Sequence, residues 1–159
     1  MDELLDLLRR NALETAEDLA KMLDCTADEV RTRITAYERQ GVIRGYQAVI
    51  NEDELDTRRV TAVIEVKVTP EREGGFDRIA KRIARFPEVQ SVYLMSGAFD
   101  LLLFVSGTDL RQVALFVSER LASIEGVTST ATHFQLKTYK SHGVNMEPHD
   151  ADGRHKVST

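Results

Sequence analysis

A run of basic side chains between residues 31 and 44 is the first place where this sequence can do chemistry. Arg31, Arg33, Arg39 and Arg44 stand there against a single acid, Glu38, so the stretch is locally +3 although the whole chain is -5. A guanidinium group forks onto the edge of a guanine or onto phosphate oxygens. DNA binding depends on the field at the contacting face, not on the net charge of the chain. These residues therefore predict a DNA-contacting surface.

The arginines fall on a helix that the sequence predicts at residues 27–39 and in the turn behind it. If Val30 and Ile34 face inward, a rotation of about 100° per residue determines which side chains face outward. The outward positions are Asp28, Thr32, Thr35 and Arg39. Arg31 lies to one side of this face, and Arg44 follows in the turn. Such a surface fits the major groove, where threonine and arginine side chains meet bases and phosphates.

A plainer interpretation of the same residues is a three-helix module whose exposed arginines only interact with water. Asp28 and Glu29 at the opening of the helix repel phosphate. Glu29 also suits a capping role, and Asp28 suits the positive end of the helix dipole. The pattern alone leaves both interpretations open.

A second candidate site is the sequence MSGAFD at residues 95–100, between two β-rich runs. Gly97 lets backbone amides approach a ligand closely, and Asp100 precedes an otherwise apolar strand. The hydroxyls of Thr130 and Thr132 can join it. Amides and hydroxyls suit the carboxylate of an amino acid, and an acidic side chain suits its ammonium group. A local capping role for Asp100 at the hairpin is an equally good interpretation.

The remaining reactive residue types form no catalytic or metal-binding set. Between His142, His149 and His155 there are six and five residues, which matches no standard zinc pattern. Cys25 stands in a predicted inter-helix turn with no histidine near it in the sequence. The sequence also lacks a nucleophile-base set, a phosphate-cradling glycine loop and the aromatic pattern of an RNA-binding sheet. We therefore expect no enzyme activity, no cofactor and no metal.

Short helices are predicted to position the basic face, at residues 2–10, 16–23 and 27–39. Thr26 and Glu29 form a T-x-x-E capping box at the start of the third helix, and Gly41 ends it. The residues expected inside are Leu19, Met22, Leu23, Val30, Ile34 and Tyr37. Residues 42–50 alternate loosely, so we expect a short strand or wing there.

From Val60 onward the pattern changes to that of an α+β domain. Residues 60–68 alternate with a period of two, which predicts a strand. There follow a helix near 76–86, a β-hairpin across Gly97, a helix over 109–124 and a strand from 127. The second of these helices is predicted to face inward with Leu110, Val113, Ala114, Val117, Leu121 and Ile124. The order is βαββαβ, the ferredoxin-like arrangement.

The predicted organisation is a helix-turn-helix domain at 1–50, a linker at 51–59, the βαββαβ domain at 60–140 and a mobile tail at 141–159. The acidic N-terminus lacks the basic region and apolar stretch of a signal peptide. The densest apolar run, residues 101–105, is far too short to span a bilayer. The single Cys25 cannot form an internal disulfide. We therefore expect a cytoplasmic protein.

That apolar run also predicts self-association. Leu101, Leu103 and Val105 point to one side of the strand, whereas Leu102 and Phe104 point to the other. One side can pack on the helices, and the other needs a second cover. A partner sheet is the obvious one, so we expect a dimer through this domain.

Taken together, the segments LAKMLDCTADEVRTRI, YERQGVIRGYQAVIN, VQSVYLMSGAFDLLLFV and VTSTATHFQLKTYK resemble a known family. In this order they are similar to the Lrp/AsnC (leucine-responsive/asparagine-responsive, feast/famine) transcriptional regulators, over about residues 3–140. The resemblance implies a winged helix-turn-helix that binds an operator, followed by a ferredoxin-like ligand-sensing domain. It also implies homo-oligomers whose assembly responds to a small effector, usually an amino acid, bound between subunits or dimers.

The resemblance also assigns site residues. It places Arg31, Thr32, Arg33 and Thr35 on the recognition helix. It places Gly97, Ala98, Phe99 and Asp100 on the hairpin that lines the effector cleft, and Thr130 and Thr132 on the facing strand. The acidic opening of the recognition helix and the histidine-bearing tail depart from the family pattern. The alternative function is a stand-alone amino-acid-binding module that contacts a protein partner in place of DNA.

Overall fold

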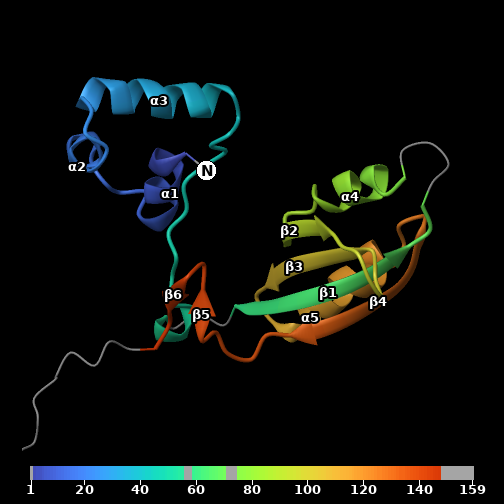
Figure 1. Cartoon of the computed structure of the whole chain (residues 1–159). Coiled ribbons are helices and arrows are strands. Elements are labelled where there is room, and N and C mark those ends of the chain that lie inside the picture. Colours follow the sequence, from blue (N-terminus) through green and yellow to red (C-terminus); the bar gives the residue numbers. More distant parts are fainter. Residues whose placement is uncertain (1, 56–58, 71–74, 148–159) are drawn as a thin grey trace, which may run out of the picture. The chain divides into compact units, whose positions relative to one another are not determined.

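Three helices make up the N-terminal unit in a computed structural model that describes residues 2–55, 59–70 and 75–147 (Figure 1). They are α1 (Glu3–Arg10), α2 (Ala16–Met22) and α3 (Ala27–Arg39). Asp2, Thr15 and Thr26 stand before these helices, and each side chain accepts a hydrogen bond from a backbone N–H of the first turn. The chain divides into this unit, Met1–Ile50, and a second one, Asn51–Thr159.

The core of the first unit is small. Its buried side chains are Leu4, Leu8, Leu19, Ala20 and Val30, with Ile34 and Tyr37 packed against them. The prediction that Met22 is buried is wrong, because 54% of this side chain is exposed. Leu23, four residues after Leu19, was also expected inside, and it packs against this core.

Residues 42–50 form no strand, so the expected short strand or wing is absent from this part of the chain. Gly41, with φ +72°, ends α3 as predicted. The N–H groups of Val42 and Ile43 then both donate to the carbonyl of Tyr37, at 2.9 and 3.2 Å. The chain turns at the end of α3, and residues 44–50 continue as irregular chain.

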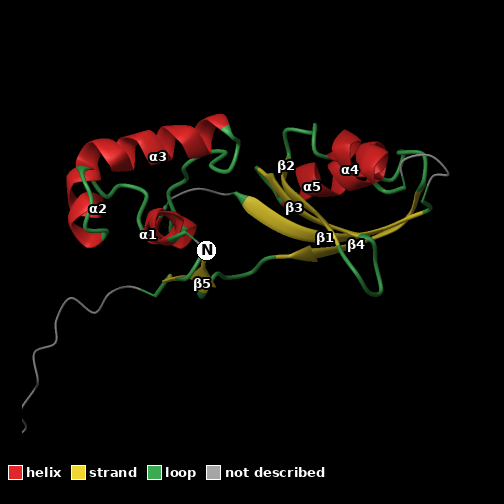
Figure 2. Ribbon diagram, turned by 45° about the horizontal axis from the view of Figure 1, so that its top comes forward, coloured by secondary structure: helices red, strands yellow, loops and turns green. Residues whose placement is uncertain are grey.

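The second unit is a four-stranded antiparallel sheet with two helices. Its strands are β1 (Val60–Val68), β2 (Val89–Leu94), β3 (Leu101–Gly107) and β4 (Val127–Phe134), in the order β2-β3-β1-β4. Both α4 (Asp77–Ile83) and α5 (Leu110–Leu115) cover the same face of this sheet (Figure 2). The predicted βαββαβ order is therefore present in the structure.

The period of two in β1 puts every second side chain into the core. Ala62, Ile64, Val66 and Val68 are buried. Ile64 lies opposite Leu103 of β3 and opposite Thr132 of β4. Because directly opposed residues share a face, this register places Thr132 on the helix-covered side of the sheet.

The last helix does not keep the expected spacing. A π-helical segment, η2 (Phe116–Leu121), follows α5 directly, and the N–H of Ala122 donates to the carbonyl of Val117 at 2.8 Å. The wider turn buries both Phe116 and Leu121, which are five residues apart. The prediction that Leu110 faces inward is wrong, since 57% of this side chain is exposed.

Residues 140–147 are ordered by contacts and differ from the mobile tail that the sequence predicts. Strands β5 (Lys140–Ser141) and β6 (Val144–Asn145) pair in a small hairpin, and Met146 is buried. The amide Nδ2 of Asn51, just before the 3-10 turn η1 (Glu52–Glu54), donates to the carbonyl of Met146 at 2.9 Å. Asn51 thereby fastens this hairpin to the expected linker. Residues 148–159 lie outside the described residues.

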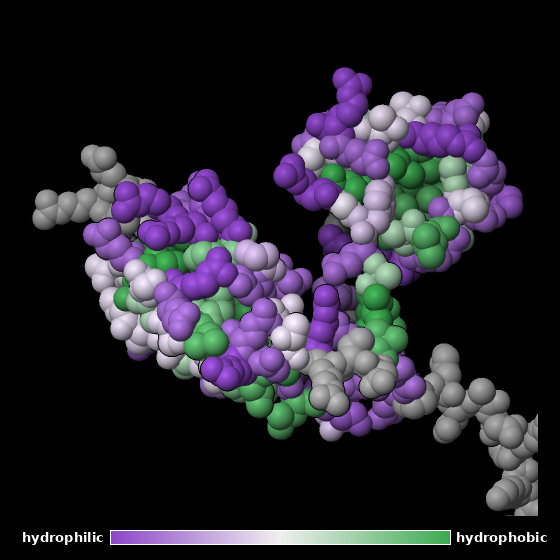
Figure 3. All heavy atoms as spheres, turned by 180° about the vertical axis from the view of Figure 1, so that it is seen from behind, coloured by the Kyte–Doolittle hydropathy of each residue, from purple (hydrophilic) through white to green (hydrophobic). Residues whose placement is uncertain are grey.

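Some large apolar side chains remain at the surface of each unit, as the green areas of Figure 3 show. Examples are Leu13 and Val42 in the first unit and Tyr93, Leu136 and Tyr139 in the second. Among the described residues, no helix is long and apolar enough to cross a membrane.

Candidate nucleic-acid interface and effector site

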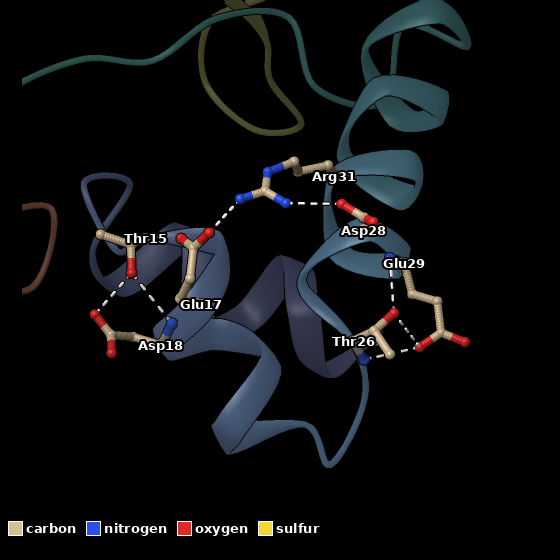
Figure 4. A network of polar contacts seen from close by, with 7 residues as sticks. All are labelled: Thr15, Glu17, Asp18, Thr26, Asp28, Glu29 and Arg31. Carbon is tan, nitrogen blue, oxygen red and sulfur yellow. Dashed lines mark hydrogen bonds and ion pairs between the residues drawn. The ribbon is translucent and has the colours of Figure 1, made fainter.

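The start of α3 is held by a complete capping box, as Figure 4 shows. The N–H of Thr26 donates to Oε2 of Glu29 at 2.8 Å, and the N–H of Glu29 donates to Oγ1 of Thr26 at 3.2 Å. The Thr26 N–H and hydroxyl together hold the pKa of the Glu29 carboxyl below its ordinary value. Glu29 is therefore occupied by the helix start.

Arg31 is held between two acids. Its Nη1 donates to Oδ1 of Asp28 at 2.8 Å, and its Nη2 forms a second ion pair with Glu17 of α2 (Figure 4). About half of the Arg31 side chain is exposed, so both pairs lie at the surface, where such contacts are weak. Arg31 joins α2 to α3, and a phosphate would have to compete with two carboxylates for it.

Arg33 faces α1. Its Nη2 donates to both carboxylate oxygens of Asp2, at 2.6 and 2.9 Å, and the hydroxyl of Tyr37 donates to the same carboxylate. The bonds from Tyr37 and Arg33 lower the pKa of Asp2 to about 2, and the bond to Asp2 raises the pKa of Arg33. Asp2 also accepts from the N–H of Leu4 at 2.9 Å. This cluster fixes α3 to the start of α1, a role that sequence analysis missed.

The outward face of α3 carries Thr32, Thr35 and Arg39, which are all exposed, and exposed Arg44 follows in the turn. Among the described residues, no ion pair engages Arg39 or Arg44. The nearby Glu38 carboxylate accepts a hydrogen bond from the hydroxyl of Tyr46 at 3.0 Å. Thr32, Thr35 and Arg39 thus share the exposed face of α3, and the exposed Arg44 follows the helix.

Asp100 has a structural contact at the hairpin. Its Oδ2 accepts from the N–H of Val68 at 2.8 Å, where the pairing of β1 with β4 shifts register. Its own N–H donates to the carbonyl of Val66 at 3.0 Å, and its carbonyl accepts from Met95 at 2.8 Å. The carboxylate is therefore held by the backbone of β1, 32 residues away in the sequence, and the bond differs from the local hairpin cap that the sequence suggested.

The other candidate effector residues lie around the same end of β1. Gly97 and Ala98 are exposed, Gly97 has φ +136°, and Phe99 is half-buried. Thr130 and Thr132 are half-buried on β4, opposite Val66 and Ile64. Strand β1 runs between the hairpin and β4, because the sheet order is β3-β1-β4. Within one chain, the two halves of the candidate site are thus separated by one strand.

The face of the sheet opposite the helices has an apolar centre. The side chains of Leu102, Phe104, Val63 and Tyr93 alternate with the buried ones and point to this side. The rings of Tyr93 and Phe104 meet edge to face at 6.1 Å between centroids. Beside them, Nε2 of His133 lies 3.4 Å from Oε1 of Glu65. The described part of this unit places no helix over this face (Figure 2).

No three-residue cluster of metal-ligating side chains is found among the described residues. His142 lies in the turn between β5 and β6, whereas His149 and His155 lie outside the described residues. Cys25 is half-buried, and it packs against the core of the first unit as a turn residue would.

The chain is similar to known proteins over most of its length. A family model described as the Lrp/AsnC ligand binding domain matches residues 61–145. An uncharacterized HTH-type transcriptional regulator of Bacillus subtilis (strain 168), YugG, is 46% identical over 157 residues, which is 98% of this chain and 95% of YugG. The HTH-type transcriptional regulator LysM of Saccharolobus solfataricus is 31% identical over 137 residues, 86% of this chain and 92% of LysM.

Among solved structures, a transcriptional regulator of Neisseria meningitidis in complex with L-Met matches the fold. The TM-score is 0.69 at 25% sequence identity, and the match covers 89% of this chain and 93% of that one.

Proposed function

We propose that this chain, which belongs to the Lrp/AsnC family of DNA-binding transcriptional regulators, is a homo-oligomer controlled by a small effector. Like the other members of this family, it is a regulator and not an enzyme. In this proposal, residues 1–50 act as the helix-turn-helix reader and the sheet unit senses the effector and drives assembly. The observation that carries it is the outward face of α3, with exposed Thr32, Thr35 and Arg39. The predicted cytoplasmic location stays a prediction.

We assign base and phosphate contacts to Thr32, Thr35, Arg39 and Arg44 first. A recognition helix enters the major groove with its exposed face, and threonine and arginine supply both kinds of contact. Arg31 contributes if DNA phosphate displaces Asp28 and Glu17. Arg33 positions α3 through Asp2 and is removed from the set of direct contacts in this proposal.

The open face of the sheet is the proposed dimer surface. Leu102, Phe104 and Val63 are only half-buried there in a single chain. A second sheet placed over them removes this apolar area from water. A dimer presents two recognition helices, which matches an operator with half-sites about one helical turn apart.

The proposed effector is an amino acid, as in the L-Met complex of the Neisseria relative. One strand separates Gly97–Asp100 from Thr130 and Thr132 within one chain, and in this proposal a second subunit completes the site. Asp100 keeps its contact with Val68 and offers charge to an ammonium group. A ligand that binds one assembly state more tightly shifts the protein toward that state.

DNA reading is tested by fluorescence anisotropy on duplex DNA from upstream of the gene, with a scrambled duplex and a salt series. Wild type is expected to prefer the upstream DNA and to lose affinity steeply with salt. Replacing Arg39 and Arg44 by alanine should weaken binding, whereas the matched pair Arg9→Ala and Arg10→Ala on α1 should not. Equal behaviour of the two variants removes the α3 face from the proposal.

Effector sensing is tested with Asp100→Asn. The amide oxygen can still accept from the Val68 N–H, while the negative charge is lost. Stability and DNA binding should therefore persist, and the shift in assembly caused by an amino acid pool should disappear. Sedimentation equilibrium at micromolar concentration measures the assembly of wild type and of the variant, with and without the amino acid pool. A wild-type monomer rejects the oligomer, and an unchanged response of the variant rejects the ligand role of Asp100.

A further inference from the structure

The strongest cluster of positive charge outside the reader lies on and just after α4. It consists of Arg78, Lys81, Arg82 and Arg85, which we call the α4 basic face. These four side chains, with Ile79, Ile124 and Glu125, line an open hollow of about 520 Å³ between α4 and the end of the last helix. Glu125 is the only acid on the rim of this hollow among the described residues.

Two of these four side chains, Arg82 and Arg85, are available to a partner. Among the described residues, Arg82 and Arg85 form no ion pair, and both are exposed. Lys81 pairs with Asp77 at 3.2 Å, but both side chains are more than 70% exposed, so this pair is weak. The face therefore keeps at least two guanidinium groups whose binding to an anion costs no existing contact.

The reader unit is acidic overall. Residues 1–50 contain ten acidic and seven basic side chains. Two of the α3 arginines, Arg31 and Arg33, are held by Glu17, Asp28 and Asp2. The attraction of DNA phosphates for basic side chains supplies a large share of protein–DNA affinity. A regulator with this reader gains from a second basic surface elsewhere in the chain.

We propose that the α4 basic face is a second DNA-contacting surface, which binds the phosphate backbone of duplex DNA without reading its sequence. Arg78, Lys81 and Arg82 follow helical spacing and Arg85 continues the row, over about 10 Å. A row of cations matches successive phosphates along a strand, whereas a single small anion needs cations that converge on one point. The proposal rests on DNA binding by this regulator.

The test uses charge reversal in the full chain. The single variant Arg85→Glu and the double variant Arg82→Glu/Arg85→Glu are compared with wild type. The control is Arg111→Glu, which changes an exposed arginine at the opposite end of the last helix from Ile124. Affinities are measured for upstream and scrambled duplexes between 50 and 200 mM salt. Loss of two phosphate contacts makes the DNA affinity of the double variant fall less steeply with salt than that of wild type. The ratio of the wild-type affinity to the double-variant affinity should therefore shrink about tenfold between 50 and 200 mM salt.

The deficit should be equal on both duplexes, because phosphate contacts carry no sequence information. The variants at Arg39 and Arg44 should instead reduce the preference for upstream DNA. Arg111→Glu should match wild type. Circular dichroism checks that each variant folds. If the charge reversal in Arg82→Glu/Arg85→Glu prevents folding, the neutral variant Arg82→Gln/Arg85→Gln replaces it.

Three results overturn the proposal. One is an affinity and a salt slope of the double variant equal to those of wild type. In another, calorimetry shows that wild type binds inorganic phosphate and that the double variant does not, while the DNA affinity of the double variant is unchanged. That result would make the hollow a small-anion site. Absence of DNA binding by wild type itself defeats both DNA surfaces, and so marks a failure of the proposed function instead of this inference alone.

Discussion

The two units are stabilised in different ways. Among the described residues, the sheet unit has a core of thirteen buried side chains, whereas the three-helix unit has five. The small unit is instead joined by polar side chains at its helix starts: Asp2, Thr15, Thr26 and their partners. Apolar burial scales with area, so a unit of fifty residues gains less from it and depends more on caps and ion pairs.

This difference has a functional meaning. A polar network at the surface responds to salt, pH and a nearby phosphate, and a dry core does not. The stability of the three-helix unit should therefore depend more on salt and pH than that of the sheet unit. The sheet unit has the larger core, and the proposed effector site and dimer surface lie on it.

The largest effect is expected in the sheet core. Leu103 is fully buried, so Leu103→Ala should lower the free energy of unfolding by about 2–5 kcal/mol. The matched variant Leu102→Ala removes the same atoms from the adjacent, half-buried position on the open face. It should cost less stability and should weaken the proposed dimer. Urea denaturation and sedimentation measure the two effects, and equal losses of stability would contradict the assignment of the faces.

A smaller effect is expected at the start of α3. Thr26→Ala removes the side-chain half of the capping box and should destabilise the three-helix unit by about 1 kcal/mol. Thr35→Ala changes an exposed threonine of the same helix and should shift stability by less than about 0.5 kcal/mol. Thermal unfolding followed by circular dichroism compares the variants. If Thr35→Ala cost as much as Thr26→Ala, the cap would not be what stabilises the helix.

The smallest effect concerns pH. The folded pKa of Asp2 is about 2, below its ordinary value of 3.8, because Tyr37 and Arg33 donate to the ionised carboxylate. A lowered pKa means that ionised Asp2 stabilises the fold above about pH 4, and that this contribution is lost as the pH falls toward about 2. Asp2→Asn should be less stable than wild type at pH 7.

The difference between Asp2→Asn and wild type should narrow as the medium is acidified through this window. Unfolding curves at several pH values measure it. A gap that stays constant from pH 7 to pH 2 would show that the Asp2 charge does not stabilise the unit.

Sequence alone determined the local features of this protein. The period of two in residues 60–68 and the T-x-x-E pattern at Thr26 act over a few residues, so the strand and the capping box could be predicted from them. The outward face of α3 follows in the same way, because Val30 sets the direction of the helix. The resemblance of four segments in order led to the family.

Tertiary structure decided the partners and the exceptions. Arg33 lies 31 residues from Asp2 in the sequence, and only the packing of α3 on α1 makes them a pair, which removes this arginine from the proposed DNA-contacting set. The π-helical turn brings Phe116 and Leu121 to one side, which an α-helical spacing excludes. Met146 is buried only because residues 140–147 fold into a hairpin fastened to Asn51. The first and last of these outcomes depend on contacts between distant segments, and such contacts leave no periodic trace in the chain.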